Sequence, residues 1–126
     1  MPPTILSVDD ERDVTDLVSF HLTRAGFSVL TAASGREALD LIAIRNPDLI
    51  ILDLMLPDID GFGICEILRR HVATATIPII ILSAWATNDA HHLGLELGAL
   101  DYVTKPFSPK KLVERVQHLL SLRESA

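Results

Sequence analysis

The sequence predicts an α/β fold in which a doubly wound, five-stranded parallel sheet is covered on both faces by five helices. Short apolar runs rich in β-branched residues alternate with longer segments whose apolar residues recur at helical spacing. Regular strand–helix alternation is typical of right-handed crossover units, which build parallel sheets with helices on both sides. The 126 residues suffice for one domain but not two, so we expect a single domain, residues 1–126, with a core from about residue 4 to residue 122.

Five runs have the length and composition of strands. The run Leu49–Leu52 is entirely apolar and predicts a fully buried strand that ends at Asp53. Pro57 and the pair Asp60-Gly61 then favour a turn, so the chain should leave the sheet just beyond Asp53. The predicted strands are Thr4–Val8, Ser28–Ala32, Leu49–Leu52, Ile79–Leu82 and Asp101–Thr104.

The segments between these runs have the one-sided apolar stripes of amphipathic helices. Ser34 and Glu37 have the spacing of an N-terminal capping box, and Ser108-Pro109 is a typical helix start. Helix ends are expected at Gly26, Asn46 and Gly98. The stripes are Val14, Leu17, Val18 and Leu22; Ala38, Leu39, Ile42 and Ala43; Ile64, Ile67 and Leu68, within a helix from Phe62 to about His71; and Leu112, Val116, Leu119 and Leu120. A further helix is expected over Asn88–Leu97.

Composition excludes several classes of protein. Hydrophobic residues make up 48% of the chain, which favours a packed globule over disorder, and no apolar run is long enough to span a membrane. The net charge of −6 disfavours direct binding of nucleic acid by this domain. The N-terminus has no secretory signal, and the single cysteine, Cys65, cannot form an internal disulfide. We therefore expect a cytoplasmic domain without a membrane contact.

Polar residues follow four of the five predicted strands. Asp9 and Asp10 follow the first strand, Asp53 the third, Ser83 the fourth and Lys105 the fifth. The carboxyl ends of parallel strands lie at the same edge of a sheet, where open α/β sheets bind ligands. Each residue alone has an ordinary explanation, as a helix cap, a turn residue or a surface lysine. Their convergence at one edge is more specific than any of them alone.

Residue types at this edge suit phosphoryl chemistry. Three carboxylates repel one another unless a cation joins them, and hard oxygen ligands suit Mg²⁺. A carboxylate can attack a phosphoryl group and become an aspartyl phosphate. The phosphoryl oxygens must then be neutralised, which a divalent metal ion and a lysine can do together. A hydroxyl across the site can hydrogen-bond to a phosphoryl oxygen.

Nitrogen and sulfur ligands are not arranged for a transition-metal site. His91 and His92 are adjacent, and adjacent helical side chains diverge by about 100°. Neither a cysteine nor a third histidine stands near them in the sequence. We therefore expect this pair on a solvated helix face.

Four motifs, each at the end of a predicted strand, give the chain a close resemblance to the receiver domain of two-component response regulators. The resemblance extends from Ile5 to about Leu122, and all four motifs occur in the family's order. The motifs are Val8-Asp9-Asp10-Glu11; Leu52-Asp53-Leu54-Met55-Leu56-Pro57 with Gly61; Ser83-Ala84; and Gly98-Ala99 through Asp101-Tyr102 to Lys105-Pro106-Phe107.

The resemblance implies a CheY-like, flavodoxin-like sheet with strand order 2-1-3-4-5. It also implies that Asp53 is the phospho-acceptor of a signalling switch and receives its phosphoryl group from a histidine kinase or phosphotransfer protein. Such a domain phosphorylates and dephosphorylates itself at this residue only and is not a turnover enzyme. Mg²⁺ would be bound by Asp10, Asp53 and the backbone carbonyl of Met55, with Asp9 reaching it through water.

The resemblance further implies how the phosphoryl group is sensed. Ser83 and Lys105 would contact it, and Tyr102 would turn inward when Ser83 moves, so that the face formed by the fourth helix, fifth strand and fifth helix changes. The peptide bond Lys105–Pro106 is expected to be cis, a form that is far less costly before proline than elsewhere. Met55 and Trp85 would flank the path of the water that hydrolyses the phosphate, and we hypothesise that they hinder it. The alternative is that Trp85 only packs on its loop.

Among receivers, the chain most resembles those of the OmpR/PhoB type, but it lacks part of their charge pattern. His91 stands where a basic Arg or Lys is usual, Leu100 where an Asp is usual, and Lys111 where a Glu is usual, whereas Arg115 is retained. Complementary charge pairs across a dimer face should therefore be lost. We expect a monomer or a weak dimer, and an effector domain C-terminal to this chain is possible.

Three other functions fit the sequence less well than the switch. An aspartyl-phosphate phosphatase of the haloacid dehalogenase type needs an acid two residues after the nucleophile, where Met55 stands. A flavodoxin-like FMN module needs a Ser/Thr/Gly-rich phosphate loop, where Asp9, Asp10 and Glu11 would repel phosphate. A degenerate receiver that serves only as an interaction platform is disfavoured by the intact acids, Ser83 and Lys105.

Overall fold

The computed structural model describes residues 2–125, with side chains up to residue 123, so both ends of the expected domain, residues 1 and 126, lie outside the described residues. Strands and helices alternate throughout, as predicted. The strands are β1 (Thr4–Val8), β2 (Ser28–Ala32), β3 (Leu49–Leu52), β4 (Ile79–Ser83) and β5 (Asp101–Thr104). The helices are α1 (Arg12–Arg24), α2 (Gly35–Arg45), α3 (Gly61–Arg70), α4 (Asn88–Glu96) and α5 (Pro109–Ser125).

The five strands form one parallel sheet in the order β2-β1-β3-β4-β5, which confirms the expected topology. The chain runs outward from β1 to β2 and then returns to β3 on the other side of β1. The strand order therefore reverses between β1 and β3, and the crossovers on its two sides leave a crevice beyond their carboxyl ends. Asp9 and Asp53 lie there, since both follow directly on these two strands.

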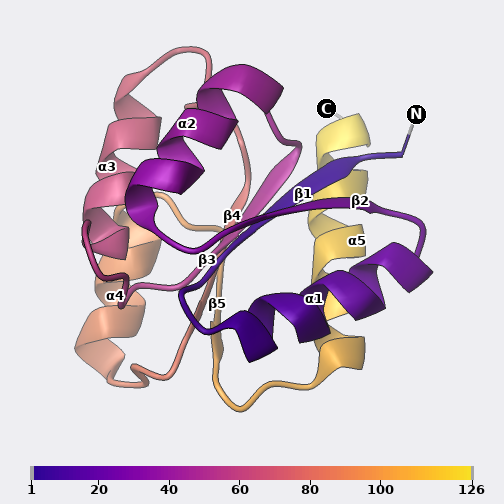
Figure 1. Ribbon diagram of the computed structural model, residues 1–126. Coiled ribbons are helices and arrows are strands. Elements are labelled where there is room, and N and C mark those ends of the chain that lie inside the picture. The colour runs from indigo at the N-terminus through magenta and orange to yellow at the C-terminus, as the bar shows by residue number, and fades with distance from the viewer. Residues whose placement is uncertain (1, 126) are drawn as a thin grey trace.

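Helices cover the sheet in two layers (Figure 1). Helices α1 and α5 lie against one face, and α2, α3 and α4 against the other. Strand β3 serves both layers: Leu49 and Ile51 pack in the α1/α5 layer, whereas Ile50 and Leu52 pack in the α2/α3/α4 layer. All four side chains are buried, as the continuous apolar run predicts.

Several predicted helix ends are confirmed. The Ser34 hydroxyl accepts a hydrogen bond from the Glu37 amide at 3.2 Å, and the Ser108 hydroxyl accepts one from the Lys111 amide at 3.3 Å. Gly26 follows α1 with a φ of +98°, a left-handed conformation that glycine adopts at no steric cost. Helix α3 begins at Gly61, one residue before the predicted start, because Asp60 accepts a hydrogen bond from the Phe62 amide and caps the helix.

Two further observations bear on the chain's general character. Among the described residues, no helix combines the length and the apolar character that a membrane crossing requires. Cys65 is buried on α3, and burial raises the pKa of its thiol to about 11, which keeps it protonated at neutral pH.

Candidate functional site

Asp53 lies directly beyond the buried strand β3, and only 4% of its surface is exposed. Its amide donates to the Val8 carbonyl of β1, so the backbone still follows the sheet at this residue. The chain then turns back, and the Gly61 amide donates to the Leu54 carbonyl. A Cβ atom at Gly61 would lie 2.6 Å from the Leu54 Cα, so this close approach requires glycine. The turn after Asp53 is therefore tightly closed.

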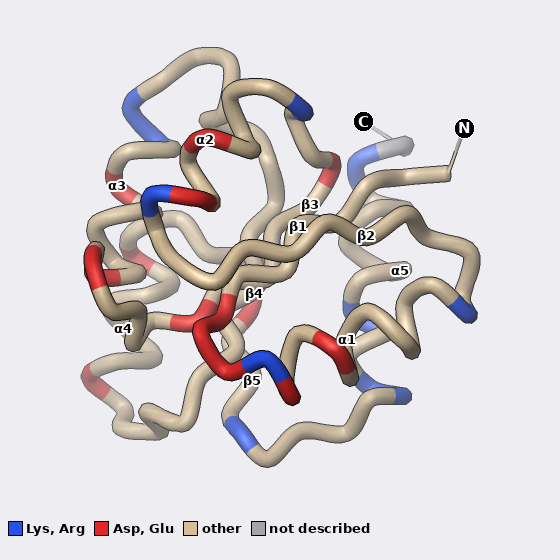
Figure 2. The backbone as a smooth tube through the Cα atoms, viewed as in Figure 1, with Lys and Arg blue, Asp and Glu red and all other residues tan. Residues whose placement is uncertain are grey.

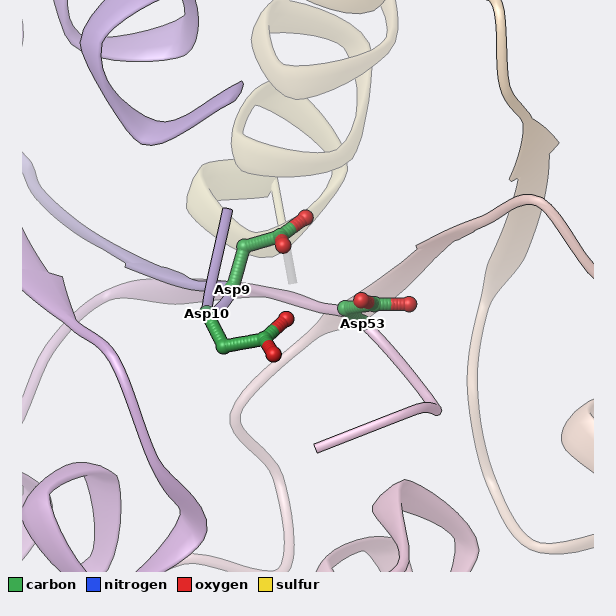
Figure 3. A group of neighbouring side chains, drawn as sticks. All are labelled: Asp9, Asp10 and Asp53. Atoms are coloured by element: carbon green, nitrogen blue, oxygen red, sulfur yellow. The ribbon is translucent and has the colours of Figure 1, made fainter. Parts of the chain in front are cut away.

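Three carboxylates meet at this point (Figure 3). Asp9, Asp10 and Asp53 each place a carboxylate oxygen within 4.8 Å of the other two. Asp9 is 3% exposed, whereas Asp10 is exposed to solvent. In Figure 2, acidic stretches of the chain gather at this edge of the sheet, between α4 and α1. The predicted convergence of these acids is confirmed.

The donors of this cluster fit a hard divalent cation. Carboxylate oxygens are the ligands that Mg²⁺ prefers, and one or two of them are usual in magnesium sites. Burial, followed by the charge of Asp53, raises the pKa of Asp9 even though Lys105 and the Glu11 amide hydrogen-bond to its carboxylate. The three carboxylates of the cluster have one ammonium beside them, that of Lys105, so the cluster has a net negative charge that a divalent cation would reduce.

Lys105 provides the fixed positive charge of the site. Its ammonium is 2.7 Å from Asp9, 3.0 Å from Glu11 and 3.6 Å from Asp53, and the side chain is only 13% exposed. Burial alone lowers the pKa of this ammonium, but the hydrogen bonds to Asp9 and Glu11 and the charge of Asp53 outweigh it, and the pKa is raised. The following peptide bond, Lys105–Pro106, is cis, as expected.

Ser83 and Tyr102 lie on the neighbouring strands β4 and β5. Ser83 is fully buried, and its hydroxyl accepts a hydrogen bond of 3.3 Å from the Trp85 amide. The Tyr102 ring is also buried, and its hydroxyl donates to the Trp85 carbonyl. Burial, with a smaller contribution from the charge of Asp53, raises the pKa of Tyr102, which keeps the phenol a donor. The loop after β4 therefore connects these two residues.

Two aromatic contacts surround this loop. The Trp85 ring packs against Phe62 of α3 with the ring centroids 5.8 Å apart. The His91 ring stacks on Tyr102, with centroids 4.9 Å apart and an angle of 17° between the planes. His91 is exposed, as expected for a solvated face, but no sequence pattern indicates its stacking on Tyr102.

Two acids acquire contacts that the sequence reasoning did not assign. Glu11 belongs to the first motif but was given no role, and its carboxylate bonds to Lys105. Asp58 was also given no role, and its carboxylate bonds to the first amides of α2. Met55 lies where the turn begins: its amide is 3.4 Å from an Asp53 carboxylate oxygen, and its residue surface is 64% exposed.

Comparisons with known proteins agree with this geometry. Residues 5–117 match the family described as the response regulator receiver domain. The chain is 44% identical to the alkaline phosphatase synthesis transcriptional regulatory protein PhoP of Bacillus subtilis over 126 residues, which are 100% of this chain and 52% of that protein. It is 44% identical to the DNA-binding dual master transcriptional regulator RpaA of Synechocystis over 118 residues, 94% of this chain and 49% of that protein. The chain spans about half the length of these OmpR/PhoB-type relatives.

Solved structures show the same likeness. A response regulator from Chloroflexus aurantiacus is 44% identical with a TM-score of 0.91, and the match covers 96% of this chain and 99% of that one. The BeF3-activated N-terminal receiver domain of Klebsiella pneumoniae RstA is 34% identical with a TM-score of 0.86, covering 93% and 97%. The chain therefore belongs to the response regulator receiver domain family, and it is a signalling module of two-component systems rather than a turnover enzyme.

Proposed function

We propose that this chain is a phosphoryl-accepting switch in which Asp53 receives a phosphoryl group from a histidine kinase or a phosphotransfer protein, in a Mg²⁺-dependent reaction. One observation carries the proposal above all others. The carboxylates of Asp9, Asp10 and Asp53 lie within 4.8 Å of one another, with the Lys105 ammonium 3.6 Å from Asp53, at the point where the strand order reverses. The family implies the histidine kinase partner.

Asp53 is the nucleophile of the proposed reaction. A carboxylate oxygen attacks the phosphorus of a phosphohistidine; the new O–P bond forms as the P–N bond breaks, and the imidazole nitrogen keeps the electron pair and takes up a proton. Asp10, Asp53 and the Met55 backbone carbonyl would hold Mg²⁺, with Asp9 reaching it through water. The bound ion supplies charge neutralisation at the phosphoryl oxygens.

Lys105 would exchange partners during the reaction. Before transfer its ammonium is shared by Asp9, Glu11 and Asp53. After transfer the phosphoryl oxygens offer a stronger concentration of negative charge within reach, so the ammonium would form a charge-assisted hydrogen bond with one of them. Ser83 would contact a second phosphoryl oxygen with its buried hydroxyl.

Tyr102 would transmit the change to the face formed by α4, β5 and α5. Ser83 and Tyr102 both bond to the backbone of Trp85, so a shift of the Ser83 hydroxyl toward the phosphoryl group would alter the loop that holds the Tyr102 hydroxyl. Tyr102 is already buried in the structure, with its hydroxyl bonded to the Trp85 carbonyl, and the proposed switch would favour this inward arrangement after phosphorylation.

The output of the switch is proposed from the relatives. They are longer transcriptional regulators, so an effector domain C-terminal to a receiver domain spanning residues 1–126 is the expected partner, and the receiver itself, at a net charge of −6, would not contact DNA. On the α4/β5/α5 face, Arg115 pairs with Asp101 of the same chain. With His91, Leu100 and Lys111 at the other positions of that face, we expect a cytoplasmic monomer or weak dimer.

Intact mass spectrometry after incubation with acetyl phosphate and Mg²⁺ tests the proposal. One added phosphoryl group is expected on the parent protein, and none on Asp53→Asn or when Mg²⁺ is removed with a chelator. The Asp53→Asn variant keeps the size of the side chain, so its circular dichroism should match the parent. A protein that gains no phosphoryl group from a range of small donors would contradict the switch and favour an interaction platform.

A further inference from the structure

The loop between β3 and α3, residues 53–60, is joined to the start of α2 by the carboxylate of Asp58. One carboxylate oxygen accepts hydrogen bonds from the amides of Gly35 at 2.8 Å and Ile59 at 2.9 Å. The other oxygen accepts from the Arg36 amide at 2.9 Å. Gly35 and Arg36 are the first two residues of α2, whose amides have no acceptor within their own helix. Asp58 therefore bonds to a helix that precedes it by more than twenty residues.

An apolar contact reinforces this link. A Cβ atom at Gly35 would lie 2.8 Å from the Ile59 Cβ, so the start of α2 and the loop are in direct contact beside the Asp58 carboxylate. Ile59 also packs against the core of the α2/α3/α4 layer. The loop is thus fixed from outside at Asp58 and Ile59, in addition to the turn that Gly61 closes with Leu54.

The charge of Asp58 suits this position. Hydrogen bonds from the Arg36 and Gly35 amides lower the pKa of its carboxyl, so the group stays ionised at neutral pH. A negative charge at a helix N-terminus is also favoured by the dipole of the helix. Ser34 caps the same helix independently, because its hydroxyl accepts from the Glu37 amide. The two caps share one helix, but only Asp58 belongs to the loop.

The side chain of Met55 does little to hold its backbone, whose amide is 3.4 Å from an Asp53 carboxylate oxygen. Its residue surface is 64% exposed, so side-chain packing restrains it little, and Pro57 beyond it is exposed as well. A backbone carbonyl is a useful ligand only when the segment that carries it is held in place before the ion arrives, since otherwise binding must order the segment. Leu54 and Leu56, on either side of Met55, pack in or against the core of the α2/α3/α4 layer, and the Asp58 carboxylate adds direct hydrogen bonds from this loop to the start of α2.

We propose that Asp58 is a positioning residue for the divalent cation: by tying the β3–α3 loop to α2, it holds the Met55 backbone where the ion binds. The inference rests on the proposed function, in which the Met55 carbonyl is a ligand. Asp58 itself does not touch the ion. Its loss should weaken ion binding while leaving the acids and Lys105 in place.

Ion binding by the unphosphorylated protein provides the readout. Mn²⁺ is a suitable probe because it favours the same oxygen ligands as Mg²⁺ and the free ion is measured by electron paramagnetic resonance. We expect Asp58→Ala to bind Mn²⁺ about tenfold more weakly than the parent, at the lower end of the losses seen when residues supporting metal ligands are removed. Asp58→Asn keeps one acceptor oxygen, so its affinity for Mn²⁺ should lie between those of the parent and of Asp58→Ala.

Ser34→Ala is the matched control. It removes the other cap of α2 and should lower Tm by a few degrees, as Asp58→Ala should, but it leaves the loop untouched and should bind Mn²⁺ as the parent does. In phosphorylation with acetyl phosphate, Asp58→Ala should need about tenfold more Mg²⁺ for half-maximal rate and should recover the parent rate at saturating Mg²⁺.

The outcomes separate the two proposals. Equal Mn²⁺ affinities for Asp58→Ala and Ser34→Ala would overturn the positioning role, even if the parent is phosphorylated at Asp53. A loss of saturated rate without a change in Mn²⁺ affinity would overturn it too. A parent protein that neither binds Mn²⁺ nor accepts a phosphoryl group would overturn the proposed function, and the positioning role with it.

Discussion

Two partly buried cations, Lys105 and Arg69, lie at opposite edges of the same sheet and are held in opposite ways. Lys105, at the carboxyl ends of the strands, is surrounded by the carboxylates of Asp9, Glu11 and Asp53. Arg69, near the amino ends of β4 and β5, donates instead to backbone carbonyls. The distances from its guanidinium are 2.8 Å to Ala75, 3.0 Å to Ile77, 2.7 Å to Gly98 and 3.5 Å to Thr74. Among the described residues, no carboxylate lies within ion-pair distance of Arg69.

The two kinds of partner explain the difference between a structural and a reactive cation. Backbone carbonyls in fixed turns neither take up a proton near neutral pH nor move away, so the guanidinium of Arg69 keeps the same hydrogen-bond partners. The Arg69 side chain also requires glycine at position 98, because a Cβ atom there would lie 2.3 Å from the Arg69 Nε. Carboxylate partners, in contrast, can give up the Lys105 ammonium when a more strongly charged group arrives. Substitutions at the two positions should therefore have separable effects on stability and on chemistry.

The largest loss of stability is expected for Arg69→Ala. The change leaves several carbonyls of the loops before β4 and β5 without a donor, which should lower the free energy of unfolding by about 2–4 kcal/mol. Urea denaturation measures this loss. Arg70→Ala is the neighbouring control, since its exposed pair with Glu66 should contribute little. Phosphorylation of folded Arg69→Ala should proceed at nearly the parent rate, and a hundredfold loss would contradict the comparison.

Lys105→Met should have the opposite effects: a large loss of phosphorylation rate and a smaller loss of stability. Removing a preorganised positive charge from the phosphoryl oxygens should slow phosphorylation by acetyl phosphate about a hundredfold. The free energy of unfolding should change less than in Arg69→Ala, because the exposed carboxylate of Glu11 can be hydrated after the change and a cation from solution can neutralise the neighbouring acids. Rates by mass spectrometry and urea curves on the same samples provide the comparison. A phosphorylation rate within about threefold of the parent rate would exclude a direct role for Lys105.

A smaller effect, on pH dependence, is expected for Asp9→Asn. Burial raises the pKa of Asp9 above its unfolded value, so the folded protein binds the proton more tightly, and stability falls as pH rises from the unfolded pKa through the folded one. Near pH 7 the penalty is complete, and Asp9→Asn should raise Tm by a few degrees. Thermal melts from pH 7 down to the unfolded pKa should show this advantage disappear. A constant difference across the range would refute the electrostatic cause.

The smallest effect is expected at Trp85. If its ring shields the phosphoryl group from water, Trp85→Glu should shorten the phosphorylated lifetime severalfold, with phosphorylation itself little changed. The lifetime is followed by intact mass after removal of the donor. An unchanged lifetime would assign the ring only the packing against Phe62 that the structure records.

The parts of the fold that the sequence predicts are those with local or topological signals. The strand Leu49–Leu52 is recognisable because a run of four apolar residues ends in a charge and a turn. The meeting of Asp9, Asp10 and Asp53 follows from parallel topology, since they lie within two residues of the ends of two strands whose carboxyl ends share one edge of the sheet. No long-range contact needed to be guessed for either conclusion.

The parts that the sequence does not predict depend on contacts between distant segments. Glu11 and Lys105 are 94 residues apart, and an acid at the start of a helix has many other uses. The acceptors of Arg69 are backbone carbonyls, which every sequence supplies, so no residue pattern marks them. Asp58 resembles an ordinary turn residue until the start of α2 is seen beside it. His91 is exposed as expected, and only the structure shows its stacking on Tyr102.

The double burial of β3 has a consequence for how freely the chain can vary. Its four side chains alternate between two helical layers and are all buried, so every position is constrained by one core or the other. Strand β2 is the outermost strand on its side of the sheet, and two of its five residues are exposed. Functional variants should therefore carry polar residues at the exposed positions of β2 but at no position of β3. Strand β3 should vary only among apolar side chains of similar volume.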